Sequence, residues 1–218
     1  LCLGHFGDPS RDETRAGLGC HGEAPVVRWR AKSKSVSAAA IRLTCGCDLP
    51  IAGMRFERTL AMKRNARIVD VTEKVTNMSR KDTPFTMCQH VTFGPPFLEP
   101  GVTLFDMPAT RGATFPGEFS KAPRLKRKAD FTWPMAPGIK GKVNLRTLGK
   151  GKSSDFSAQL MKPGLEKSWF SAVHPGMGLL VAYVWNRADY PWVGNWEENR
   201  ARDFAPWSGR SITRGMEF

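Results

Sequence analysis

Apolar and polar residues alternate with a period of two in several separate stretches of the chain. In the clearest of them, residues 54–62, Met54, Phe56 and Leu60 share one face, and Arg55 points to the other. Such alternation over six or more residues is the signature of a half-buried β-strand, because successive side chains of a strand point to opposite faces. The pattern therefore predicts a strand here.

The same pattern predicts strands along most of the chain. No stretch of about 12 residues has the 3.6-residue period of a helix, and only residues 12–16 are expected to form a helical turn. The 21 glycines and 16 prolines interrupt the sequence at short intervals, which favours many strands joined by turns. The predicted strands are 25–31, 36–47, 54–62, 67–76, 83–93, 129–133, 143–147, 155–161, 168–173, 179–185, 192–196 and 212–218.

Many short strands with turn signals between them are typical of an all-β, antiparallel β-sandwich. No linker or repeat divides the chain, so we expect a single domain over residues 1–218. The region 107–152 is the least regular and is expected to consist mainly of loops. The chain begins at Leu1 instead of Met and ends at Phe218 within a predicted strand. We therefore expect a fragment of a longer chain, incomplete at both termini.

The chain is strongly basic, with a formal net charge of +13 and a pI near 9.9. Such a balance suits nucleic acid, an anionic membrane or an acidic ligand. However, Lys and Arg are spread along the sequence, and the densest run, residues 124–128, lies in a Pro-rich stretch that is expected to be an exposed loop. We therefore expect no nucleic-acid and no membrane partner, whereas an anionic sugar stays possible.

The five cysteines do not indicate a metal site. Their number is odd, no Cys-x-x-Cys pair occurs, and Cys45 and Cys47 have no further ligand at metal-binding spacing. We expect reduced thiols in a cytoplasmic protein, with no metal. No signal peptide or transmembrane run is visible in the sequence.

Four histidines are candidates for acid–base chemistry near neutral pH. His90 has the most informative position, because it ends a predicted strand just before Pro95-Pro96, where side chains tend to face a functional site. His21 precedes a strand and is followed by Gly22. The other two, His5 and His174, are interpreted as structural.

The candidate carboxylates lie near the end of the chain. Glu217 lies within a strand beside glycine and apolar residues, where a carboxylate is unusual unless it serves a site. Glu197 and Glu198 compete with it, but adjacent acids on a strand point to opposite faces, so at most one could join the same site. Aromatic rings nearby could stack on a sugar or pack in the core. These rings belong to Trp185, Trp192, Trp196 and Trp207.

Three groups of motifs resemble aldose 1-epimerases, and they occur in the family's order. The first is His21-Gly22 followed by Trp29. The second runs from Val75-Thr76-Asn77-Met78-Ser79 through Thr83-Pro84-Phe85 to His90-Val91-Thr92-Phe93, although the family's Pro-Tyr-Phe-Asn after the histidine is replaced by Val91-Thr92-Phe93-Gly94. The third combines residues 179–185, Trp192-Val193-Gly194-Asn195 and Gly215-Met216-Glu217.

The resemblance implies a galactose mutarotase-like supersandwich and an isomerase that interconverts sugar anomers by acid–base ring opening and reclosure. It assigns Glu217 as base and His90 as acid, with His21 and Asp155 orienting sugar hydroxyls. From their chemistry, Trp192 and Trp196 are the expected stacking surfaces. The expected partner is a monosaccharide or sugar phosphate, with no cofactor. The chain begins too late to contain the sugar-binding arginine that the family has upstream of the His-Gly motif. The alternative function is a non-catalytic carbohydrate-binding module on the same sandwich.

Overall fold

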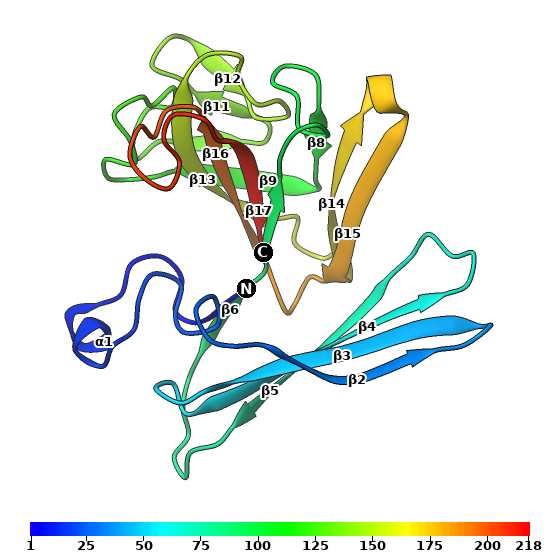
Figure 1. Ribbon diagram of the computed structural model, residues 1–218. Coiled ribbons are helices and arrows are strands. Elements are labelled where there is room, and N and C mark those ends of the chain that lie inside the picture. The colour runs from blue at the N-terminus through cyan, green and yellow to red at the C-terminus, as the bar shows by residue number, and fades with distance from the viewer. The chain divides into compact units, whose positions relative to one another are not determined.

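Strands joined by turns and longer loops form almost all of the regular structure in the computed structural model, which describes residues 1–218 (Figure 1). One short α-helix, α1 (Arg11–Arg15), and one 3₁₀ turn, η1 (Pro175–Met177), are the exceptions. The chain divides into two units, residues 1–88 and residues 89–218. The single domain expected over residues 1–218 stays a prediction.

The first unit is built on a four-stranded antiparallel sheet. Its strand order is β2-β3-β4-β5, and the two longest strands, β3 and β4, run side by side from Ala40↔Lys63 to Leu49↔Met54. Gly53 has a φ of +64° in the turn between them, a conformation that glycine adopts without strain. The strands are β2 (Arg30–Val36), β3 (Ala40–Leu49), β4 (Met54–Lys63) and β5 (Asp70–Asn77), and a separate pair joins β1 (Cys2–Gly4) to β6 (Thr86–Cys88).

A small apolar core fills one end of this sheet. Phe56 is fully buried, and its ring meets Trp29 edge-on at 5.4 Å. Leu49 and Met54, which face each other at the hairpin end, are buried beside it together with Leu3. The other end of the sheet is largely exposed, so the predicted alternation in residues 54–62 leads to burial only near the hairpin.

The second unit is a β-sandwich. Its larger sheet has the order β12-β11-β10-β9-β13-β16-β17-β7, and its smaller sheet has the order β15-β14-β8. The larger sheet contains β7 (His90–Phe93), β9 (Ala109–Thr114), β10 (Asp130–Thr132), β11 (Met135–Pro137), β12 (Lys142–Asn144), β13 (Ser153–Met161), β16 (Trp192–Asn199) and β17 (Ile212–Glu217). The smaller contains β8 (Leu104–Asp106), β14 (Lys167–His174) and β15 (Leu179–Asn186).

Aromatic side chains from both sheets pack together between them. Phe170 of β14 is fully buried, and its ring centroid lies 6.1 Å from that of Phe93 and 5.8 Å from that of Phe218. Trp185 stacks on Phe218 at 4.1 Å and donates its indole N–H to the carbonyl oxygen of Tyr190. These contacts fix one face of the larger sheet against the smaller sheet and leave its other face for a site.

The all-β antiparallel sandwich expected from the sequence is confirmed, and so are most of the strands. The predictions at 54–62, 155–161, 168–173, 179–185 and 212–218 agree with β4, β13, β14, β15 and β17 to within about two residues at each end. No helix of the chain is long and apolar enough to cross a membrane.

Two strand predictions need correction, and four strands were missed. The strand expected at 25–31 begins only at Arg30, because Val26 and Val27 donate backbone hydrogen bonds back to Glu23 and form a turn. The strand expected at 83–93 is two strands, since β6 pairs with β1 whereas β7 pairs with β17. The strands β1, β8, β9 and β11 were not predicted. Three of them have only three residues, too few for a periodic signal.

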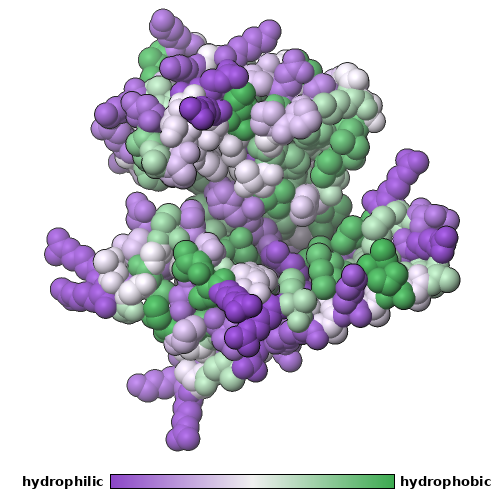
Figure 2. All heavy atoms as spheres, in the orientation of Figure 1, coloured by the Kyte–Doolittle hydropathy of each residue, from purple (hydrophilic) through white to green (hydrophobic).

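Hydrophilic side chains are distributed over the visible surfaces of both units instead of forming one patch (Figure 2). One residue of the basic run 124–128 departs from the expected exposed loop. The Arg124 side chain is only 20% exposed, and it forms ion pairs inside the second unit.

The aromatic contacts predict the effect of truncating Phe170. Phe170→Ala should lower the free energy of unfolding by about 3–5 kcal/mol, because it leaves a large cavity among packed rings. The matched control is Phe85→Ala, which truncates a side chain that is 47% exposed and should change stability little. Urea unfolding followed by tryptophan fluorescence measures both, and equal effects of the two variants would contradict the described core.

Candidate functional site

His90 and Glu217 face each other across neighbouring strands on one face of the larger sheet. In the register of β7 and β17 they are directly opposed, and Glu217 is in turn opposed to Gly194 of β16. The next residues on the same face, two positions along each strand, are Thr92, Gly215 and Trp196. Residues from three strands therefore meet at one place.

The carboxylate and the imidazole are in direct contact. Nε2 of His90 lies 3.0 Å from Oε1 of Glu217, and the Glu217 side chain is 3% exposed whereas that of His90 is 21% exposed. On the other side of the ring, Nδ1 lies 3.2 Å from the hydroxyl oxygen of Thr92, which fixes the ring orientation. The pair is thus a buried carboxylate beside a partly accessible imidazole, within the distance over which a proton can be transferred.

Two glycines make room for this carboxylate. A Cβ on Gly215 would lie 2.5 Å from Oε1 of Glu217, so the carboxylate lies directly over the bare backbone of this residue. A Cβ on Gly194 would lie 2.8 Å from the Phe156 ring and 3.4 Å from Cβ of Glu217. Larger residues at these positions would displace the groups that form this face.

Tryptophans flank the pair on the same face. The Trp196 ring meets the His90 ring edge-on with centroids 6.0 Å apart, and the guanidinium of Arg202 lies 5.2 Å from the Trp196 ring. Trp192 is 43% exposed, with the guanidinium of Arg111 at 5.8 Å from its ring. Trp192 and Trp196 therefore lie on the same face as the acid–base pair, whereas Trp185 belongs to the core.

The opposite face of the same strands carries a buried charged cluster. In register, Asp155 of β13 faces Glu197 of β16, which faces Arg214 of β17. Arg214 is completely buried, donates a 2.6 Å hydrogen bond to the carbonyl oxygen of Leu145 and lies 4.1 Å over the Phe105 ring.

Glu197 neutralises this buried arginine. Its two carboxylate oxygens contact Arg214 and Arg124, so one acid lies between two guanidinium groups. Burial lowers the pKa of Arg214 to about 10, and the charge of Glu197 opposes that shift. The guanidinium therefore stays charged at neutral pH, and the cluster holds the sandwich together instead of facing a ligand.

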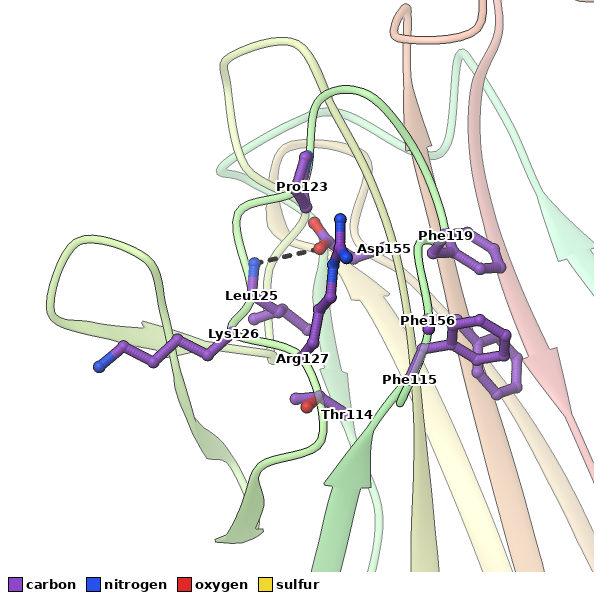
Figure 3. A pocket seen from close by; sticks show the side chains of 10 residues that line it. Thr114, Phe115, Phe119, Pro123, Leu125, Lys126, Arg127, Asp155 and Phe156 are labelled. Atoms are coloured by element: carbon purple, nitrogen blue, oxygen red, sulfur yellow. Dashed lines mark hydrogen bonds between the residues drawn. The ribbon is translucent and has the colours of Figure 1, made fainter.

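Asp155 is turned away from the acid–base pair. Its carboxylate accepts hydrogen bonds at 3.0 Å from the backbone amides of Arg124 and Leu125, as Figure 3 shows for Leu125. Burial raises the pKa of Asp155, and the two amides counteract this. The sequence-based expectation grouped Asp155 with His90 and Glu217, but the structure places it on the other face of the sheet. There it fixes the loop that carries Arg124.

Glu198, another candidate for the base, also has structural hydrogen-bond partners. It is fully buried and accepts hydrogen bonds from the backbone amides of Ala201 and Arg202, at 2.6 Å and 3.0 Å. Glu197 and Glu198 point to opposite faces, as expected for adjacent strand residues, but both carboxylates hold structural partners. Among the three acids considered for the base, Glu217 is the one paired with an imidazole.

His21 lies in the first unit, and the structure does not place that unit relative to the second. There Nδ1 of His21 accepts a hydrogen bond from the backbone N–H of Gly7 at 3.1 Å. The predicted role of His21 in binding sugar stays a prediction. His174 caps η1 by accepting from the amide of Met177, which agrees with its structural interpretation.

The sequence did not identify three residues that form the two faces of this sheet. Arg124 appeared to belong to a solvated basic run, and Arg214 appeared only as a strand residue before a glycine. Thr92 follows His90 by two residues, so its place on the same face could have been predicted from the strand period. No group of three or more His, Cys, Asp or Glu side chains is arranged to hold a metal ion.

Comparison with solved structures gives a match in fold over most of this chain. The chain superposes on the crystal structure of a putative aldose 1-epimerase from Klebsiella pneumoniae subsp. pneumoniae MGH 78578, with a TM-score of 0.59 and 13% sequence identity. The match covers 91% of this chain and 48% of that one, so the chain spans about half the length of its structural neighbour.

The chain has the fold of an aldose 1-epimerase. The galactose mutarotase-like sandwich implied by the sequence motifs is confirmed at this level. No protein-family model and no curated protein matches the sequence.

The buried cluster of this epimerase-like sandwich predicts a sharp difference between acids. Glu197→Ala should destabilise the protein by about 3–5 kcal/mol, because it leaves the buried charges of Arg214 and Arg124 uncompensated. Glu118→Ala, which removes an exposed partner of Arg127, is the matched control and should have little effect. Chemical unfolding measures both, and a stable Glu197→Ala variant would contradict the structural role of this cluster.

Proposed function

We propose that the chain catalyses the interconversion of sugar anomers as an aldose 1-epimerase-type isomerase, with Glu217 as general base and His90 as general acid. The observation that carries this proposal is the 3.0 Å contact between these two side chains beside Trp196. The likeness in fold to an aldose 1-epimerase supports it.

The direct contact of acid and base suits the chemistry. In a cyclic aldose, the hydroxyl group that loses its proton and the ring oxygen that gains one are attached to the same anomeric carbon. Two adjacent catalytic groups can therefore reach both oxygens. Glu217 accepts the hydroxyl proton while protonated His90 donates to the ring oxygen, and the bond between the anomeric carbon and the ring oxygen breaks.

Reclosure reverses both proton transfers. After the aldehyde group rotates, His90 takes the proton back from the released hydroxyl as its oxygen attacks the carbonyl carbon, and Glu217 returns its proton to the carbonyl oxygen. Each group ends in its starting state, so the cycle needs no cofactor. The hydrogen bond between His90 and Thr92 keeps the same imidazole nitrogen directed to the site in both steps.

Trp192 and Trp196 provide the sugar-binding surface in this proposal. The C–H faces of a pyranose stack on aromatic rings, and Trp192 has 43% of its surface available for such contact. Arg111, whose guanidinium lies near the Trp192 ring, adds a positive charge to this face, whereas Arg202 near Trp196 is paired with Glu198. We therefore expect a monosaccharide or a sugar phosphate as substrate.

The first experiment is anomer exchange, measured by polarimetry or NMR on a panel of freshly dissolved aldoses and sugar phosphates. His90→Ala and Glu217→Ala should each reduce the accelerated rate by about 100- to 10,000-fold, because each removes one positioned proton-transfer group. Glu118→Ala is the matched control, because it removes an exposed carboxylate that lies outside the strands of the sheet and pairs with Arg127. Unchanged acceleration in folded His90→Ala would rule out the proposed acid.

Gly215→Ala tests the position of the carboxylate separately from its presence. The added Cβ would displace Oε1 of Glu217, which is the movable end of a side chain, so the fold should persist while the base is misplaced. A loss of roughly 100-fold in kcat is expected, because small displacements of catalytic groups are costly. Full activity in Gly215→Ala, with unchanged circular dichroism, would contradict the described geometry.

A non-catalytic carbohydrate-binding module is the second candidate, favoured by one observation. Asp155, which the family resemblance assigns to substrate, faces the sandwich interior instead of the tryptophans. This candidate predicts saturable sugar binding that is lost in Trp192→Ala, with no accelerated anomer exchange. The exchange assay and a calorimetric sugar titration on the same samples distinguish the two functions.

A further inference from the structure

Cys2 and Cys88 lie directly opposite each other in the first unit. They form one end of the antiparallel pair β1–β6, in which Leu3 faces Met87 at the next position. Directly opposed residues of an antiparallel pair have Cα atoms about 4.5–5.5 Å apart. This range lies within the separation of about 4.4–6.8 Å that a disulfide bridges. The backbone thus already holds the two residues at bonding distance.

His21 is fixed beside Cys2 by the backbone. Gly22 forms an isolated parallel bridge with Leu3, and a Cβ on Gly22 would lie 2.4 Å from the Leu3 carbonyl oxygen, so only glycine permits this approach. The Gly7 amide donates to Nδ1 of His21 at 3.1 Å. Because Nδ1 accepts this bond, the ring proton lies on Nε2, the nitrogen that remains to donate.

The Cys2 sulfur is stabilised as a thiolate. Hydrogen bonds from the side chains of Cys88 and His21 lower the pKa of Cys2 to about 5, with the bond from Cys88 the larger cause, although burial acts in the opposite direction. The thiolate is the reactive form of cysteine, so at neutral pH this pair holds one thiolate and one thiol.

We propose that Cys2, Cys88 and His21 form a redox-active dithiol site that exchanges with small-molecule disulfides and ends as a Cys2–Cys88 disulfide. This proposal is independent of the epimerase function. Cys88 is the more exposed of the two sulfurs and receives the incoming disulfide, whereas Cys2, which is 2% exposed, completes the exchange from inside.

The exchange takes place in two successive thiolate attacks. The Cys88 proton passes to Cys2, and the Cys88 thiolate attacks one sulfur of the small disulfide and releases its other half as a thiolate. That thiolate takes the proton from Cys2, and the Cys2 thiolate then attacks the Cys88 sulfur and releases the second half. The protein loses two electrons to the small disulfide, which leaves as one thiol and one thiolate.

The other cysteines lack this arrangement. Cys45 and Cys47 lie two residues apart on β3, so their side chains point to the same face along one strand instead of facing each other across two. Burial raises the pKa of the Cys47 thiol, with the charge of Asp48 as a further cause. Cys20 is exposed and lies outside the strands. Selective bridging of Cys2 to Cys88 is therefore expected.

The test is incubation of the full chain with oxidised glutathione at pH 7, followed by acid quenching, alkylation and non-reducing tryptic mass spectrometry. The expected product joins peptide 1–11 to peptide 82–111 and has lost two hydrogens. Cys20→Ser is the matched control and should give the same linked peptide. Bridges that involve only Cys20, or no linked peptide from folded protein, would overturn the proposal.

The pH dependence provides a second readout. Between pH 6 and pH 8 the rate of bridging should change little, because one thiolate is present throughout, whereas an ordinary thiol would accelerate by roughly 100-fold over this range. His21→Gln should lower the rate at pH 6 by about tenfold while circular dichroism stays unchanged. A rate that rises about 100-fold from pH 6 to pH 8 in the unmodified chain would contradict the preformed thiolate.

Discussion

Successive side chains of a strand point to opposite faces, and this constraint organises the second unit. Along β17, Arg214 and Met216 face the sandwich interior, while Gly215 and Glu217 face the other way. The same alternation along β16 separates Glu197 from Trp196. One sheet therefore carries a charged and aromatic core on one face and the proposed site on the other, with a single layer of backbone between them.

The environment of each carboxylate determines what it can do. Glu197 neutralises two buried guanidinium groups, Asp155 and Glu198 bind backbone amides, and Glu217 meets an imidazole. The first three carboxylates stabilise the fold, because the guanidinium groups and backbone amides that they bind would otherwise be left unpaired inside the protein, which is costly. Glu217 differs in that its partner is the partly exposed imidazole of His90, and we propose that this pair transfers protons.

Much of this fold follows from the sequence period. Long alternating strands such as β4 and β13 are visible because six or more residues repeat the pattern, whereas β8 and β11, with three residues each, give no periodic signal. The placement of His90 opposite Glu217 could not be derived from the period, since it depends on the register between strands far apart in sequence. The resemblance to aldose 1-epimerases supplied that pairing as an expectation.

The same limit explains the outcome for Asp155 and Arg124. Alternation assigns Asp155 to one of two faces but does not say which face meets the site until β13 is registered against β16. Arg124 lies in a run of basic residues that composition alone assigns to solvent, and only the return of its loop to Asp155 and Glu197 makes it part of the interior. Contacts between segments far apart in the sequence determine where both side chains lie, and local sequence patterns do not reveal such contacts.

The central claim is that a sugar binds on the face that carries Glu217, beside Trp192 and Trp196. The most direct test is a titration of ¹⁵N-labelled protein with the sugars of the panel, with the tryptophan indole N–H signals assigned by single substitutions. The account predicts shifts for Trp192 and Trp196, and none for the buried Trp133 and Trp185. A sugar that binds while the Trp192 and Trp196 signals stay in place would contradict it.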